Sequence, residues 1–259
     1  MIDGLSYKVA GQGSRTLLCL HGIGTDASSF HHQMSAFADT RVVAWNMPGY
    51  GASEVRQMPP DFAHLSQRLQ ALIDGLGGPV HLLGQSIGGM LALDHALRVP
   101  HQVASISLVA TTPRFGGRDD SFKAAFLKAR LDPLDQGQTM AQMAAETAPH
   151  LVGPDADPLE IKQIEAALAR VPEATWRGIL QCLVTFDRAR DLGDLACPAM
   201  LVAGSVDRNA PVKTMEKMAA RIPNAQVHVL DGAGHMLHQE QPQMFNALLS
   251  NFLNEMRPV

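Results

Sequence analysis

The sequence predicts an α/β fold, in which a mostly parallel, twisted sheet carries helices on both faces and a helical lid is inserted. Three observations predict it. Short apolar runs alternate with longer stretches of helical periodicity along most of the 259 residues, as expected when helices connect parallel strands. This alternation stops between about residues 113 and 190 and then resumes. Apolar residues make up 46% of the chain, which suffices for a large core and excludes an intrinsically disordered chain.

The strands are predicted from short apolar runs bounded by turn residues. These runs lie at residues 16–20, 42–45, 80–83, 103–109, 199–203 and 226–230. Between them, residues 62–76 and 87–99 have helical spacing, and Pro100 ends the second of these stretches.

The segment from residue 113 to 190 shows consecutive amphipathic helical patterns and no convincing strand. Apolar residues recur there at i, i+3, i+4 and i+7, as in Phe122, Ala125, Phe126 and Ala129. Because strand-like runs resume at residue 199, we expect a helical lid inserted into one core domain of residues 1–112 and 191–259. The alternative is two separate domains.

Composition excludes several classes of function. With 21 Lys and Arg against 25 Asp and Glu, the net charge is −4, and no basic run suggests a nucleic-acid partner. No apolar run is long enough to cross a membrane, and the first residues do not resemble a secretory signal. The three cysteines include no close pair, which argues against disulfides and thiolate metal sites. We expect a cytoplasmic monomer or homodimer.

A glycine-rich turn supplies the candidate nucleophile. The sequence GQSIGG at residues 84–89 follows the run at 80–83 and opens the next helix. Small residues around Ser86 permit the sharp, strained turn that exposes a serine hydroxyl. A G-x-S-x-G string also arises by chance, so its place between a strand and a helix carries the prediction.

A serine nucleophile needs a base, and the base needs an orienting carboxylate. Among the 11 histidines, His235 lies in a glycine-containing loop directly after the last predicted strand. His238, the main competing candidate, lies early in the final helix. Asp207 follows the run at 199–203 and is also a common type of turn or cap residue. Since Ser86, Asp207 and His235 each follow a strand, we expect them to form a catalytic triad.

Donors for an oxyanion are expected in two turns. The sequence LHGIG at residues 20–24 follows the first strong strand, and its glycines allow backbone N–H groups to turn inward. We predict that the backbone N–H groups of Ile23 and Ile87 form the oxyanion hole. The alternative for residues 21–22 is a tight turn without a catalytic role.

Together these motifs resemble the α/β-hydrolase fold family, most closely its bacterial β-ketoadipate enol-lactonases and small carboxylesterases. The resemblance rests on residues found in family order over nearly the whole chain: His21-Gly22, PGYG at 48–51, GQSIGG at 84–89, Asp207 and Gly234-His235. Asn46 stands where family members often carry Asp, and we expect it to be structural. Ser86 disfavours the family branches with an aspartate nucleophile, and Met236 disfavours the carbon–carbon hydrolases, which usually carry Trp there.

The resemblance implies hydrolysis of a small carboxylic ester or lactone through an acyl-enzyme on Ser86, with His235 as base and Asp207 stabilising the imidazolium. It implies a small-molecule substrate, no metal and no organic cofactor. Two alternatives stay open. One is a carbon–carbon bond hydrolase or cofactor-free lyase that uses the same triad, and the other is a slow-turnover ligand-binding regulator.

The inserted segment is expected to form the substrate pocket. Candidate lining residues are Met140, Met143, Trp176 and Leu180, although their helical spacing fits core packing equally well. An anionic substrate would need a cation in this pocket. The candidate cations in this segment are expected at the solvated surface: Arg114, Lys123, Lys128, Arg177 and Arg188.

Overall fold

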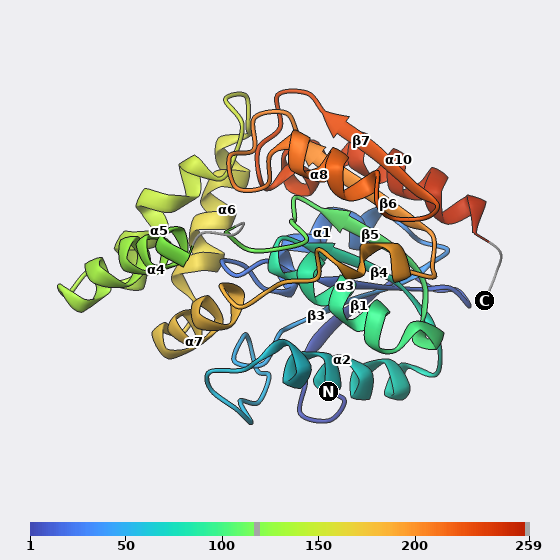
Figure 1. Ribbon diagram of the computed structural model, residues 1–259, viewed down its shortest axis with the longest axis horizontal. Helices are drawn as coiled ribbons and strands as arrows, with labels where there is room; N and C mark the ends of the chain where they lie inside the picture. The colour runs from blue at the N-terminus through green and yellow to red at the C-terminus, as the bar shows by residue number, and fades with distance from the viewer. Residues whose placement is uncertain (117–119, 257–259) are drawn as a thin grey trace.

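A computed structural model describes residues 1–116 and 120–256 (Figure 1). Its centre is a seven-stranded sheet of order β1-β3-β2-β4-β5-β6-β7, in which β1 is antiparallel to β3 and all other neighbours are parallel. The strands are β1 (Tyr7–Ala10), β2 (Thr16–Leu20), β3 (Arg41–Trp45), β4 (Val80–Gln85), β5 (Val103–Val109), β6 (Ala199–Gly204) and β7 (Ala225–Leu230). The predicted fold class is confirmed.

Strand β1 is the strand that the apolar pattern did not reveal. Its four residues are half-buried or exposed, so no apolar run marks it. It lies at the edge of the sheet and pairs on one side only, with β3. Edge strands with one free side need no continuous apolar sequence, which explains why this one escapes a search based on hydrophobicity.

Alternate side chains of the buried strands enter two different cores. The helices that cover the sheet are α1 (His31–Ala36), α2 (Phe62–Leu76), α3 (Ile87–Arg98), α8 (Val212–Ala219) and α10 (Pro242–Glu255). In β2, Leu18 and Leu20 belong to the core shared with α2, α3 and α8, whereas Leu17 and Cys19 belong to the core shared with α10. Helix α1 contacts α10.

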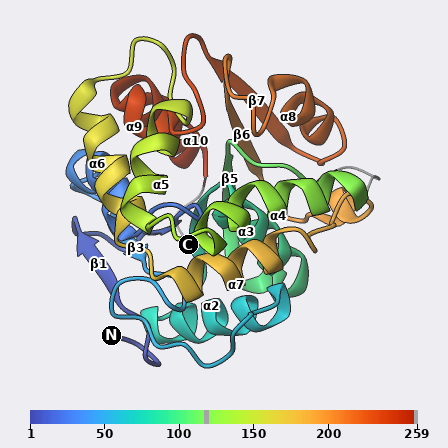
Figure 2. The same ribbon diagram turned by 90° about the vertical axis from the view of Figure 1, so that its left-hand side faces the viewer.

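The described part of the segment between β5 and β6 contains four α-helices: α4 (Asp120–Asp135), α5 (Met140–Thr147), α6 (Pro158–Ala169) and α7 (Glu173–Leu183). Figure 1 places them together at the left, and Figure 2 shows them in front of the sheet. A β-bridge between Arg114 and Asp187 joins the two ends of this segment. We call residues 113–190 the inserted segment; residues 117–119 within it, like 257–259 in the core, lie outside the described residues.

Asn46, at the end of β3, ties three parts of the core together. Its side-chain oxygen accepts a hydrogen bond from the backbone N–H of Ala27 at 2.9 Å, and its nitrogen donates to Ser6 Oγ at 2.8 Å. These contacts support the structural role expected for Asn46. Of the helices described, none is both long enough and apolar enough to cross a bilayer.

Candidate active site

The turn between β4 and α3 holds Ser86 in a strained backbone conformation, with φ of 55° and ψ of −122°. Positive φ is costly for a residue with a side chain, so the surrounding turn must enforce it. A Cβ atom on Gly84 would lie 2.3 Å from the carbonyl oxygen of Gly88, and one on Gly88 would lie 2.1 Å from that of Leu20. The two glycines therefore allow the strand and helix to approach closely enough to form this turn.

His235 and Asp207 meet as the sequence predicts. His235 Nδ1 lies 2.8 Å from Asp207 Oδ2, and the Asp207 side chain is buried. The other carboxylate oxygen accepts the N–H groups of Asn209 and Ala210 at 2.7 and 3.2 Å. Asp207 therefore both stabilises a turn and contacts the histidine. Burial by itself raises the pKa of Asp207, but the hydrogen bond and charge of His235, together with the two N–H groups, hold that pKa below its usual value.

Ser86 and His235 line one cavity of about 690 Å³. Its wall combines residues that follow β2, β4, β5 and β6 with residues of the inserted segment, so this segment covers the carboxyl edge of the sheet. In the described chain no hydrogen bond joins Ser86 Oγ to His235. Catalytic contacts of this kind are often loose until substrate binds.

The inserted segment contributes to the cavity differently from the prediction. Trp176 and Leu180, on α7, line it as expected. Met140 and Met143 do not belong to its described lining, and this part of the prediction is wrong. Met143 is buried in the main core, and Met140 packs against that core, because the apolar face of α5 is used for packing.

The two residues predicted to form the oxyanion hole, Ile23 and Ile87, differ in exposure. Ile23 lines the cavity. The Ile87 side chain is buried, but the backbone of Ile87 lies near the site because this residue directly follows Ser86. Within the described residues, neither backbone N–H has an intramolecular acceptor. Both groups are thus free to donate to a ligand.

His21 fixes the loop that carries Ile23. Its Nε2 accepts the backbone N–H of Met47 at 3.0 Å, so its Nδ1 carries the hydrogen that is donated to the Gly22 carbonyl at 2.8 Å. Burial keeps this ring neutral by lowering its pKa to about 4. The Tyr50 hydroxyl also donates to the carbonyl of Ile23 at 2.7 Å. Residues 21–22 therefore hold the loop of Ile23 in place in addition to forming a tight turn.

The loop of His235 is held by groups that the sequence did not reveal. The Glu240 carboxylate accepts the backbone N–H groups of Gly234 at 2.9 Å, Met236 at 3.0 Å and, from the inserted segment, Gly153 at 2.7 Å. The backbone N–H of His235 donates to the carbonyl of Leu151 at 2.7 Å. The inserted segment thus fixes the position of His235 directly.

Gln85, the residue before Ser86, makes a further link from the serine turn. Its side-chain nitrogen donates to the carbonyl oxygen of His235 at 3.1 Å. No sequence pattern points to this contact or to that of Glu240 with Gly153, because each joins residues far apart in the chain.

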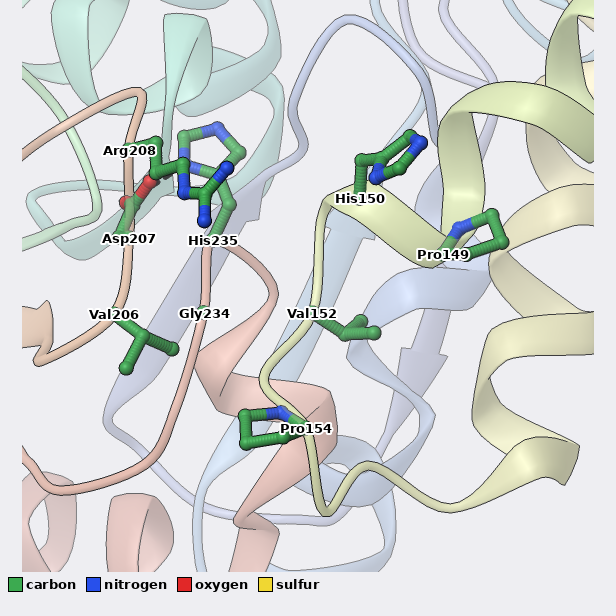
Figure 3. Close-up of a pocket in the computed structure, with 9 residues that line it drawn as sticks. All are labelled: Pro149, His150, Val152, Pro154, Val206, Asp207, Arg208, Gly234 and His235. Atoms are coloured by element: carbon green, nitrogen blue, oxygen red, sulfur yellow. Dashed lines mark hydrogen bonds and ion pairs between the residues drawn. The ribbon is translucent and has the colours of Figure 1, made fainter.

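A second hollow, of about 590 Å³, lies on the Asp207 side of His235. Figure 3 shows Asp207, Arg208 and His235 on one side of it and His150, from the inserted segment, on the other. His235 and Arg208 line both this hollow and the larger cavity. The histidine is therefore accessible from two directions.

Three arginines line the larger cavity, and two of them have no acidic partner among the described residues. Its described lining includes Arg114, Arg130 and Arg208 and contains no Asp or Glu. Arg114 pairs with Asp187 at 2.5 Å, but no carboxylate among the described residues pairs with the other two. The Arg130 guanidinium lies 3.6 Å over the centre of the Phe126 ring, and burial lowers its pKa.

Five basic residues of the inserted segment were expected at the surface, but one of them, Arg114, lines the cavity. All five have acidic partners: Arg114 with Asp187, Lys123 with Asp120, Lys128 with Asp132, Arg177 with Glu173 and Arg188 with Asp94. Arg130 and Arg208 were missed, because sequence alone does not say which face of a helix or turn borders the cavity.

His238, the competing histidine, lies away from Ser86. It is buried between Phe30 and Phe245, with ring centroids 5.2 and 6.2 Å away, and it is not among the described lining residues. Burial, with the charges of neighbouring histidines, lowers its pKa to about 3. This geometry favours His235 as the base.

Comparison with known proteins places this arrangement in a family. The model of the α/β hydrolase family matches residues 17–248. The dihydrolipoyllysine-residue acetyltransferase component of the acetoin cleaving system from Pseudomonas putida is 31% identical over 96% of this chain, which spans 66% of that relative. A 2-hydroxy-6-oxononadienedioate/2-hydroxy-6-oxononatrienedioate hydrolase from Burkholderia vietnamiensis is 27% identical, covering 95% of this chain and 90% of the relative.

Among solved structures, an enol-lactonase from Burkholderia xenovorans superposes with a TM-score of 0.86 at 22% identity, covering 98% of both chains, and shows the same fold. The family match, the order of the strands and the turn that holds Ser86 agree with one another. This chain belongs to the α/β hydrolase family.

Proposed function

We propose that the protein is a serine hydrolase that cleaves a small carboxylic ester or lactone. The observation that carries the proposal is the His235–Asp207 hydrogen bond in a cavity shared with Ser86. Since His235 Nδ1–H donates to the carboxylate, the neutral ring keeps a lone pair on Nε2 for the serine proton. Membership of the α/β hydrolase family supports hydrolysis as the type of reaction.

In the proposed reaction, Ser86 Oγ attacks the carbonyl carbon while its proton passes to His235 Nε2. The negative charge that develops on the carbonyl oxygen is stabilised by the N–H groups of Ile23 and Ile87. The imidazolium, stabilised by Asp207, then gives its proton to the departing alcohol oxygen. Water, deprotonated by His235, attacks the acyl-enzyme, releases the acid and restores Ser86. In a lactone, the alcohol stays attached to the acyl group throughout, and this last step releases a single hydroxy acid.

The arginines of the cavity favour a substrate with an anionic group away from the scissile carbonyl. The chain as a whole has a net charge of −4, yet the described lining of this cavity carries only basic charges. A half-buried guanidinium without an acidic partner is suited to bind a carboxylate through two parallel hydrogen bonds. We propose Arg130 as this group, and the Burkholderia vietnamiensis relative is itself named for a dioate substrate.

The test is a panel of matched esters and lactones with and without a second carboxylate. Ser86→Ala should abolish turnover of every substrate. Arg130→Met should raise KM for anionic substrates by about 10- to 100-fold, the size of one or two charged hydrogen bonds, and leave neutral esters unchanged. Lys128→Met is the matched control, because Lys128 lies on the same helix, is exposed and pairs with Asp132. Equal loss on both substrate classes would remove Arg130 from this role.

Two other functions remain candidates. The first is a carbon–carbon bond hydrolase, because the named substrates of the Burkholderia vietnamiensis relative are oxo acids. Product analysis separates the two reactions, because cleavage of a carbon–carbon bond releases no alcohol. A ligand-binding regulator would show one slow turnover and a tightly retained ligand, so rapid multiple turnover removes that function.

A further inference from the structure

We propose that His31, His32 and Glu160 form a binding site for a zinc ion that joins the core to the inserted segment. His31 and His32 begin α1, and Glu160 lies in the first turn of α6. None of the three belongs to the described lining of the Ser86 cavity, so the proposed site is separate from the catalytic one.

The three side chains present their ligand atoms at distances that suit one metal ion. Glu160 Oε1 lies 2.9 Å from His32 Nε2 and 3.4 Å from His31 Nε2, and all three ligand atoms lie within 4.8 Å of one another. Tetrahedral zinc with bonds of about 2.0–2.1 Å separates its ligand atoms by about 3.3–3.4 Å. The two separations measured from Glu160 Oε1 are therefore close to those between ligand atoms around one zinc ion.

The hydrogen bond on the far side of the His31 ring favours metal binding. His31 Nδ1 lies 3.2 Å from the backbone carbonyl of Ser28, which can only accept, so Nδ1 carries a hydrogen. A neutral His31 then directs the lone pair of Nε2 at a Glu160 oxygen, which is also an acceptor. A cation between the two atoms removes this conflict, and an Nδ1–H to carbonyl bond is a common way to orient metal-binding histidines.

The buried carboxylate of Glu160 also favours a bound cation. Its side chain is 10% exposed, and in the described chain its polar partners are the two histidines and Gln239. The nearby Lys162 is instead paired with Glu165 at 2.8 Å. A buried carboxylate is stable only with a compensating cation or hydrogen bonds. Two half-exposed histidines provide the remaining ligands and a path for an ion to enter.

Zinc is the divalent ion that these ligands suit. Two imidazole nitrogens and one carboxylate oxygen match zinc, whereas magnesium and calcium require mainly oxygen ligands. Water would complete the tetrahedron. The ion would join α1 to the first turn of α6, and the ion pair of Arg170 with Asp26 at 2.8 Å holds the other end of α6 to the core. Bound zinc should therefore stabilise the packing of this segment on the core.

The competing explanation is an ion pair of Glu160 with protonated histidines and no metal. Calorimetric titration of the tag-free, EDTA-stripped chain with Zn²⁺ distinguishes the two. We expect one zinc per chain, no comparable binding of Mg²⁺, and a melting temperature that rises with Zn²⁺. Glu160→Gln and His32→Gln should each weaken zinc binding by more than about 100-fold and remove the thermal shift.

Two further variants control for other histidines. His101→Gln changes an exposed histidine outside the cluster and should leave zinc binding unchanged. His150→Gln tests the hollow beside His235, and loss of zinc in this variant but not in His32→Gln would move the ion there and overturn the proposal. The proposal also fails if wild-type protein shows no saturable zinc binding at micromolar concentrations. Circular dichroism of each variant checks that it is folded.

Discussion

The carboxyl edge of the sheet and the inserted segment both line the cavity, but different features determine which of their residues reach it. At the sheet edge, Ser86, Asp207 and His235 each follow a strand, so their position depends on backbone topology. In the inserted segment, a residue reaches the cavity only if its helix turns the correct face inward. Topology can be read from short patterns, whereas the choice of face depends on packing across the whole molecule. This contrast predicts where substitutions will have the largest effects.

At the sheet edge, substitution of Asp207 should have the largest effect after substitution of Ser86, the proposed nucleophile. Asp207→Asn removes the charge that holds His235 in the productive tautomer, and we expect kcat to fall by about 10⁴-fold. The melting temperature should fall only modestly, because an amide oxygen can still accept the N–H groups of Asn209 and Ala210. Steady-state kinetics with thermal melts checks both. Near-normal kcat would mean that another carboxylate orients the base.

Glu240 tests whether the two regions are coupled. In Glu240→Gln an amide NH2 would face backbone N–H groups that now donate to a carboxylate oxygen, leaving at least one of them unpaired. An unsatisfied buried group costs about 1–3 kcal/mol, so we expect kcat to fall by about 10-fold and the melting temperature to drop. Glu255→Gln, which changes an exposed contact with Gln226, is the matched control. If Glu240→Gln behaved like this control, the contacts of the Glu240 carboxylate would not be needed to position His235.

Acid should destabilise the core through its buried histidines. Burial lowers the pKa of His21, His81 and His95 to about 4 and that of His238 to about 3, and all four lie in the core. Between these values and about pH 6.5 the unfolded chain binds protons that the folded chain does not, so stability falls as pH falls through this range. Denaturant unfolding at pH 7 and pH 5 should show a loss of several kcal/mol. Constant stability over this range would contradict the burial of neutral histidines.

Sequence patterns located most of the sheet because buried parallel strands are short and apolar. They missed β1, whose edge position leaves it half-exposed, and they missed Glu240 and Gln85, whose contacts exist only after folding. They also missed Arg130. Helix α4 carries charged residues around much of its circumference, so its sequence does not show that Arg130 borders the cavity while Lys128 is exposed.

The account depends most on Ser86 being a nucleophile activated by His235. The direct measurement is intact-mass spectrometry after treatment with a fluorophosphonate, which phosphonylates activated serines. We predict one adduct per chain on the wild-type protein and none on Ser86→Ala, with labelling of His235→Ala slowed at least 10³-fold because the base is lost. Equal labelling of wild type and Ser86→Ala would contradict the account, since the reactive group would then lie elsewhere in the chain.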